Sequence, residues 1–144
     1  MSDADRLRAL AELVPVLEAP DADFGHWETP PGTLGYFELG RAGEAFRSAV
    51  GRGGWVIAGC DWRAWLETPE GTALRERPEA TAEASMEQLA RLLTAIVRSD
   101  RFVEGSMEGA FESGLLARIA HRAAVLLAAL EAETDGSGPP NARP

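Results

Sequence analysis

The sequence contains a single cysteine and no lysine, and both shortages exclude particular kinds of chemistry. With Cys60 alone the chain has no internal disulfide, which is typical of a protein in the reducing cytoplasm. All fourteen basic residues are arginine, so lysine Schiff bases and lysine phosphate clamps are excluded. We therefore expect a cytoplasmic protein that uses neither device.

Long apolar runs and basic segments are also missing. The longest apolar run, Ala123 to Leu130, is far too short to span a bilayer. No basic region precedes an apolar segment at the start, so no signal peptide is expected. The formal net charge of −9 disfavours binding to nucleic-acid phosphates and to anionic lipid. We therefore expect no nucleic-acid partner and no membrane partner.

Motifs for metals, cofactors and nucleophiles are likewise missing. The two histidines, His26 and His121, have no cysteine or acidic partner at metal-ligand spacing, so no metal ligand is predicted. His26 and Glu28 share one face of a predicted strand, which makes a general-base pair conceivable but unspecific. Residues 40–43, Gly-Arg-Ala-Gly, lack both the dinucleotide fingerprint and the Walker lysine. We predict no cofactor and no catalytic residue.

The residues that are present indicate one folded domain. The chain has 144 residues, of which 45% are apolar, and it contains four tryptophans, enough for a single core. Residues 1–130 are predicted to form this globular domain. The last segment, 131–144, cannot bury enough apolar surface to stay ordered, so we predict a disordered C-terminal tail.

Two apolar-faced helices are predicted to organise the fold. In Met86–Val97 the apolar residues recur three and four apart and share one face. Ser85 and Gln88 form a capping box that marks the start of this helix. The second helix, Leu115–Leu130, carries a broad leucine stripe. We expect the two faces to pack against each other at the centre of the core.

Shorter elements are predicted around this pair. A helix over Asp3–Leu17 is interrupted by Pro15. Phe24–Glu28 and Leu34–Leu39 read as a hairpin, and a helix covers Arg41–Arg52. Trp55–Ala58 is predicted as a third strand. Together these elements indicate an α+β fold, mainly α, in which a small antiparallel hairpin-based sheet packs beside a helical bundle.

Helix boundaries in the middle of the chain are marked by caps and prolines. Thr68 and Pro69 start a helix that ends at Arg77, before Pro78. Residues 79–84 have no clear apolar face and are predicted to be a solvated connector. A short helix over residues 106–113 is expected to start with Ser106 as its N-cap and to end at Gly114.

The best candidate for a functional site is the charged segment between the two long helices. Arg98, Asp100, Arg101 and Glu104 bring two guanidinium groups close to two carboxylates. If one arginine is left unpaired, the segment could bind an anionic group. In the structural alternative, the charges satisfy one another and the exposed helix ends, and they only fix the turn.

A second candidate site is aromatic. Trp62 and Trp65 lie three residues apart on a predicted short helix and could line a pocket for a flat or apolar ligand, together with Trp27 or Trp55. Core packing is the commoner fate of such side chains. Asp61, just before them, is more typical of an N-cap than of a catalytic acid, and we retain it as a candidate ligand-binding residue.

The segment LLTAIVRSDRFVEG, the turn Glu112-Ser113-Gly114 and the leucine-rich last helix resemble a bacterial family, domain of unknown function 6508. The likeness continues upstream through Gly54-Trp55-Val56-Ile57 and through Asp61-Trp62-Arg63-Ala64-Trp65. It covers about two-thirds of the chain. Gly59-Cys60 departs from the proline and phenylalanine that the family pattern has there. The resemblance implies membership and no activity.

Two functions remain open from the sequence. We expect a non-enzymatic protein that binds a partner or a small ligand at the charged segment and the tryptophans. The alternative is a small enzyme for an acidic or aromatic substrate, with Asp100 or Glu104 as base and the arginines as an anion clamp. The alanine-rich last helix could also pair with a second copy, so a homodimer is a further expectation.

Overall fold

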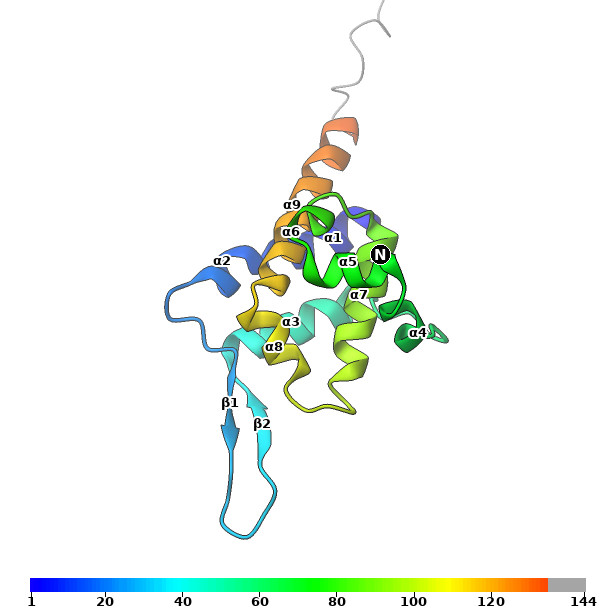
Figure 1. Cartoon of the computed structure of the whole chain (residues 1–144). Coiled ribbons are helices and arrows are strands. Elements are labelled where there is room, and N and C mark those ends of the chain that lie inside the picture. The colour runs from blue at the N-terminus through cyan, green and yellow to red at the C-terminus, as the bar shows by residue number, and fades with distance from the viewer. Residues whose placement is uncertain (135–144) are drawn as a thin grey trace, which may run out of the picture.

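The structure, a computed structural model, describes residues 1–134 and confirms an α+β fold that is mainly helical (Figure 1). A two-stranded antiparallel hairpin projects from a body of helices. In chain order the elements are α1 (Asp3–Ala11), α2 (Leu13–Glu18), β1 (Gly25–Glu28), β2 (Tyr36–Leu39), α3 (Arg41–Arg52), α4 (Trp62–Leu66), α5 (Pro69–Glu76), α6 (Pro78–Thr81), α7 (Met86–Ser99), α8 (Ser106–Glu112) and α9 (Leu115–Thr134).

The N-terminal helix breaks before the proline that was expected to interrupt it. Ser2 and Asp5 form a capping box at the start of α1. The break lies at Glu12, so that Pro15 occupies the third position of α2. A proline in the first turn removes no intrahelical hydrogen bond, because the first N–H groups of a helix have no partner there. The break therefore places Pro15 where it costs least.

The hairpin and the capped helices agree with the prediction, whereas the third strand does not. Residues 55–58 form an irregular segment without a strand partner among the described residues. Trp55 is fully buried in the core and its indole Nε1 donates to the Arg6 carbonyl at 3.3 Å. The Ile57 amide donates to the Thr94 hydroxyl of α7 at 2.9 Å. The backbone of this segment is thus satisfied by helices instead of a sheet.

The segment 79–84 was wrongly predicted to be a solvated connector. Its first part belongs to α6, and Thr81 and Ala84 are fully buried. The Thr81 hydroxyl donates to the Leu74 carbonyl at 3.0 Å, and the Ala84 carbonyl accepts from Arg122 Nε at 2.8 Å. A short alanine-rich segment shows little hydrophobic periodicity. The conformation and burial of residues 79–84 are therefore set by their contacts with distant residues.

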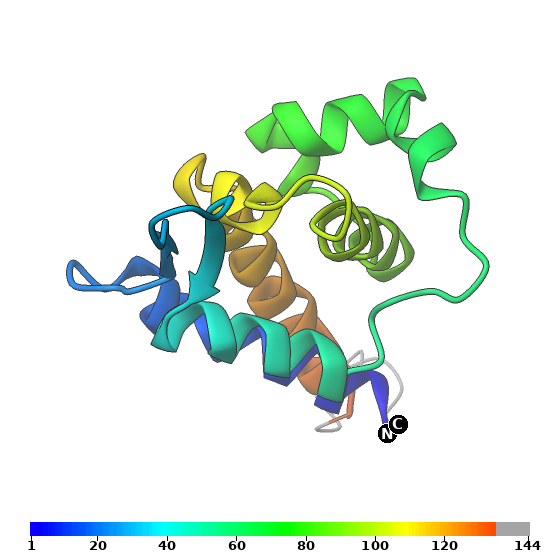
Figure 2. The ribbon, with the colours of Figure 1, turned by 90° about the horizontal axis from the view of Figure 1, so that it is seen from below.

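Both predicted apolar faces belong to one core, but they do not form its main helix pair. Leu92 of α7 and Leu116 of α9 are almost fully buried, and Leu127 packs against the same cluster. The principal partner of α9 is α1, and an ion pair of 3.1 Å joins Arg8 to Glu131. Figure 2 shows α7 nearly end-on, with α5 above it and α3 below. The core is therefore shared among several helices.

The predicted tail falls partly outside the described residues. Helix α9 continues through Glu131 to Thr134, beyond the predicted boundary at Leu130. Residues 135–144 lie outside the part of the chain that the structure describes, so the expectation of a disordered tail remains a prediction for them.

Candidate functional site

The charged segment 98–105 comprises the last two residues of α7 and the connection from α7 to α8, and hydrogen bonds to backbone groups hold it. The Asp100 carboxylate caps the first turn of α8 by accepting the Met107 amide at 3.1 Å. Gly105 precedes this helix with φ +94°, a left-handed conformation that favours glycine. Ser106 is the first helical residue, which corrects its predicted role as N-cap, and its hydroxyl donates to the Val103 carbonyl at 2.7 Å.

The same segment holds the hairpin against the helical body. Glu104 Oε2 accepts the backbone amide of Phe37 in β2 at 2.7 Å. The Trp27 indole in β1 donates to Glu108 of α8 at 3.1 Å and packs against Gly105, where a Cβ atom would collide with the ring. The two carboxylates of the segment, Asp100 and Glu104, therefore have structural contacts with backbone amides.

The arginines of the segment differ from this pattern. Within residues 1–134 neither Arg98 nor Arg101 forms an ion pair, and the four predicted charges do not pair with one another. Arg98 is half-buried, and its buried Nε has no hydrogen-bond partner in the described chain. Arg101 is exposed. The mutual pairing expected in the structural alternative is therefore not observed.

One of the candidate tryptophans lies beside the charged segment. The Trp62 ring lies 6.0 Å from that of Phe102, and the Arg63 guanidinium lies 4.4 Å from the Phe102 centroid and 5.2 Å from that of Trp62. Asp61 Oδ1 accepts the Ala64 amide at 3.2 Å and is the expected N-cap of α4. Contacts of the Trp62 ring and the Arg63 guanidinium with the Phe102 ring thus join α4 to the charged segment.

The other tryptophans have structural partners. Trp65 Nε1 donates to Glu70 Oε1 at 2.8 Å, and this bond is the main reason why the pKa of the Glu70 carboxyl lies below its ordinary range. Gln88 and Arg91 of α7 reach the same carboxylate at 3.2 and 3.4 Å. Glu70 therefore connects α4 and α5 to α7.

A groove of about 500 Å³ lies next to the charged segment, between α5, α7 and α8. The segment contributes Ser99 and Val103, and the charged residues at the groove are Arg75 and Glu76 of α5. Most lining residues are apolar or small: Leu66, Leu92, Ala95, Ile96, Val103, Gly109, Ala110 and Leu115, with Ser99, Ser106 and Ser113. None of the seven predicted site residues lines it.

A second hollow of about 480 Å³ adjoins the groove and is lined by Trp62, Arg63 and Thr72 among others. It shares Leu66 and Arg75 with the groove. The predicted residue Trp62 and the unpredicted groove thus belong to neighbouring concave surfaces. No sequence signal identifies the groove, because its walls meet only when α5, α7 and α8 pack together.

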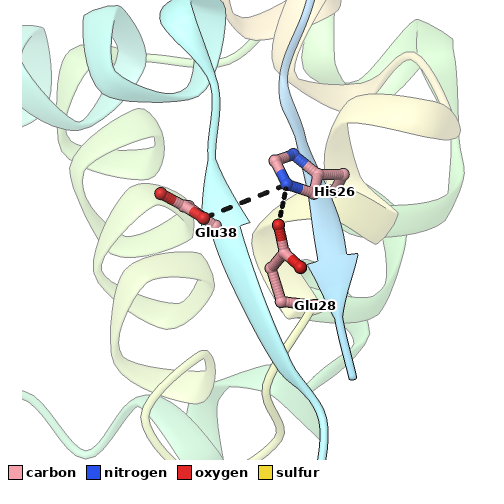
Figure 3. A group of neighbouring side chains, drawn as sticks. All are labelled: His26, Glu28 and Glu38. Atoms are coloured by element: carbon pink, nitrogen blue, oxygen red, sulfur yellow. Dashed lines mark hydrogen bonds and ion pairs between the residues drawn. The ribbon is translucent and has the colours of Figure 1, made fainter. Parts of the chain in front are cut away.

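Three side chains of types that can ligate metals, His26, Glu28 and Glu38, lie together on the hairpin (Figure 3), and none of them lines the groove. His26 Nε2 lies 2.8 Å from Glu28 Oε1 and 3.9 Å from Glu38 Oε2. The strand register places Glu38 directly opposite His26. The sequence spacing showed only His26 and Glu28, because the third side chain comes from the other strand.

The imidazole of His26 is expected to titrate above its ordinary pKa of 6.5. The hydrogen bond to Glu28 is the main cause of the raised pKa, and the charges of Glu28, Glu38 and Asp23 raise it further. While Glu28 is ionised, the pair therefore stabilises the hairpin at pH values below 6.5, and this contribution is lost as the pH rises through the raised pKa of His26. NMR titration of the His26 ring in chelator-treated buffer measures the pKa. In Glu28→Gln it should fall; an unchanged pKa would contradict the pairing.

No single helix in residues 1–134 is long and apolar enough to cross a membrane. Helices α8 and α9 reach that length and apolar content only when counted together, across a bend of 71°.

Comparison with known proteins identifies the family of the chain but not its function. Residues 2–129 match the profile of a family of unknown function, DUF6508. No curated protein and no solved structure matches the chain. The matched region runs from the N-cap of α1 into α9 and contains the hairpin, the charged segment and the groove. Because the match covers most of the sequence, the chain belongs to the family DUF6508.

Proposed function

We propose that this protein is a non-enzymatic, cytoplasmic binding protein for a small amphiphilic molecule, and that the groove between α5, α7 and α8 is its binding site. The observation that carries the proposal is the groove itself. Its volume of about 500 Å³ falls in the range of about 300–1,000 Å³ that is typical of small-molecule sites. Its mainly apolar lining suits a ligand with an apolar body.

The charges near the groove favour an anionic group on this ligand. Arg75 lies where the groove meets the neighbouring hollow and forms no ion pair with any residue of the described range. Arg63 and Glu67 line the same hollow. A carboxylate, sulfonate or phosphate placed there would lie beside Arg75, and a guanidinium group binds such oxyanions through paired N–H donors.

No specific observation favours the enzyme that the sequence left as an alternative. Its proposed bases, Asp100 and Glu104, accept hydrogen bonds from the backbone amides of Met107 and Phe37. The carboxyl groups with a shifted pKa, Asp5 and Glu70, both have it lowered, whereas a catalytic acid near neutral pH needs it raised. We therefore propose binding alone, and self-association through α9 stays a prediction.

A pair of glycine variants tests the site. Gly109 lines the groove from α8, and a Cβ atom added there would meet no other atom within 4 Å. Gly109→Leu should therefore add a bulky side chain at the wall of the groove while leaving α8 folded, since leucine is also the better helix former. Gly51→Leu is the matched control, because Gly51 also lies inside a helix, α3, with open space around its Cβ position.

The probe is 8-anilinonaphthalene-1-sulfonate, which combines an apolar body with a sulfonate and fluoresces when it leaves water. We expect wild type and Gly51→Leu to bind it with equal affinity and Gly109→Leu to bind at least about tenfold more weakly. Arg75→Gln should also weaken binding of the probe. Equal binding by wild type and Gly109→Leu would refute the groove as the site. A thermal-shift screen of carboxylate and phosphate metabolites then searches for the natural ligand class.

A further inference from the structure

The geometry of the hairpin places three metal-ligating atoms side by side. Antiparallel pairing sets His26 opposite Glu38, and the two-residue period of a strand puts Glu28 on the same face. His26 Nε2 and one carboxylate oxygen from each glutamate all lie within 4.8 Å of one another. Figure 3 shows the Glu28 carboxylate pointing toward the imidazole and the Glu38 carboxylate on the neighbouring strand, farther from it. Within the described residues, these three side chains form the one group of at least three histidine, cysteine, aspartate or glutamate residues whose ligand atoms lie this close together.

The distances are compatible with a tetrahedral metal site. Zinc bonds of about 2.0–2.1 Å to nitrogen and oxygen place ligand atoms about 3.4 Å apart. The three atoms span both sides of this value, from 2.8 Å for His26 with Glu28 to at most 4.8 Å. Rotations that move the atoms by about 1.4 Å or less would close the site. The side chains are 43–57% exposed, so they have room to rotate.

The charge of the group also favours a cation. Glu28 and Glu38 place two carboxylates around a single imidazole. No arginine in residues 1–134 forms an ion pair with either glutamate. A dication would neutralise both carboxylates and leave its remaining positions open to water. One imidazole nitrogen with two carboxylate oxygens is a donor set that suits zinc better than magnesium or calcium, which prefer oxygen ligands alone.

We propose that His26, Glu28 and Glu38 bind one divalent cation of the zinc class, with His26 coordinating through Nε2 and water completing the coordination. The ion replaces the hydrogen bond between His26 and Glu28 and links β1 to β2. This site is separate from the groove and does not depend on the function proposed above.

The test is a calorimetric titration of the full chain with Zn²⁺, in a Cys60→Ser background that removes the one thiol. The matched control is His121→Gln: His121 also lies close to a glutamate, at 3.0 Å from Glu18, with similar exposure, but it has no third ligand in the described chain. We expect one Zn²⁺ per chain. Affinity should fall at least about tenfold in His26→Gln and Glu38→Gln and stay unchanged in His121→Gln.

Two further measurements separate coordination from a purely structural ion pair. Zn²⁺ should shift the NMR signals of the His26 ring, whereas Mg²⁺ and Ca²⁺ at the same concentration should not. Glu38 makes only the longer contact of 3.9 Å in the absence of metal, so Glu38→Gln should lose affinity while its metal-free thermal midpoint stays near that of wild type. Absence of Zn²⁺ binding, or equal binding by wild type and His26→Gln, would overturn the proposal.

Discussion

Replacing Leu92 with alanine is expected to lower the free energy of unfolding by about 2–5 kcal/mol. Leu92 is fully buried on the face of α7 that meets the shared core. Truncation removes apolar burial and leaves a cavity that the surrounding helices fill only in part. Urea unfolding followed by circular dichroism measures the loss. The loss should be large because Leu92 is fully buried among the core side chains.

Leu34→Ala is the control for this experiment. Leu34 lies in the loop that connects β1 to β2, and its side chain is 93% exposed. The same change of side chain should therefore alter the free energy of unfolding by no more than about 0.5 kcal/mol. If the two variants lost equal stability, Leu92 could not occupy the buried position described here.

Gly43→Ala is expected to destabilise the protein by about 1–3 kcal/mol, although alanine is the better helix former. Gly43 lies in α3 directly beneath the carbonyl of Phe24, and an added Cβ would approach that oxygen more closely than real Cβ atoms do. The Phe24 carbonyl is itself held by the Gly40 amide at 2.9 Å, so it cannot easily move away. Thermal unfolding gives the comparison with wild type.

Gly51→Ala provides the opposite result within the same helix. A Cβ at Gly51 meets no atom within 4 Å. This variant should be stabilised by no more than about 0.5–1 kcal/mol through helix propensity, because Gly51 lies in the last turn of α3. Stabilisation of both variants would show that α3 does not approach the start of the hairpin as closely as the structure has it.

Local signals in the sequence were enough to predict most elements. Ser85 with Gln88 and Thr68 with Pro69 identified two helix starts, because side-chain caps act within one turn. The hairpin followed from two aromatic-rich runs around a proline and glycine turn. These features depend on neighbours in the chain, so the sequence shows them directly.

Elements decided by distant contacts were harder to predict. Trp55 begins an apolar run that has the composition of a strand, yet its neighbours are Arg6 and α7. Thr81 is polar and lies in an alanine-rich segment, but its hydroxyl is satisfied by the Leu74 carbonyl inside the core. Tertiary packing overrode local propensity at both places.

The candidate site shows the same division. Charge and position directed attention to residues 98–104, and the connection between α7 and α8 does border the groove through Ser99 and Val103. The groove itself could not be predicted, because Arg75 and Gly109 meet only after folding. Glu38 was missed beside His26 for the same reason, since only the strand register brings them together.

The most direct test of the groove is to locate the bound probe. Two-dimensional amide NMR of the wild-type chain, titrated with 8-anilinonaphthalene-1-sulfonate, reports every backbone site that it affects. We predict shifts concentrated at Ser99, Val103, Gly109 and Ala110, and their loss in Gly109→Leu but not in Gly51→Leu. Shifts confined to other surfaces, or unchanged by Gly109→Leu, would contradict the account.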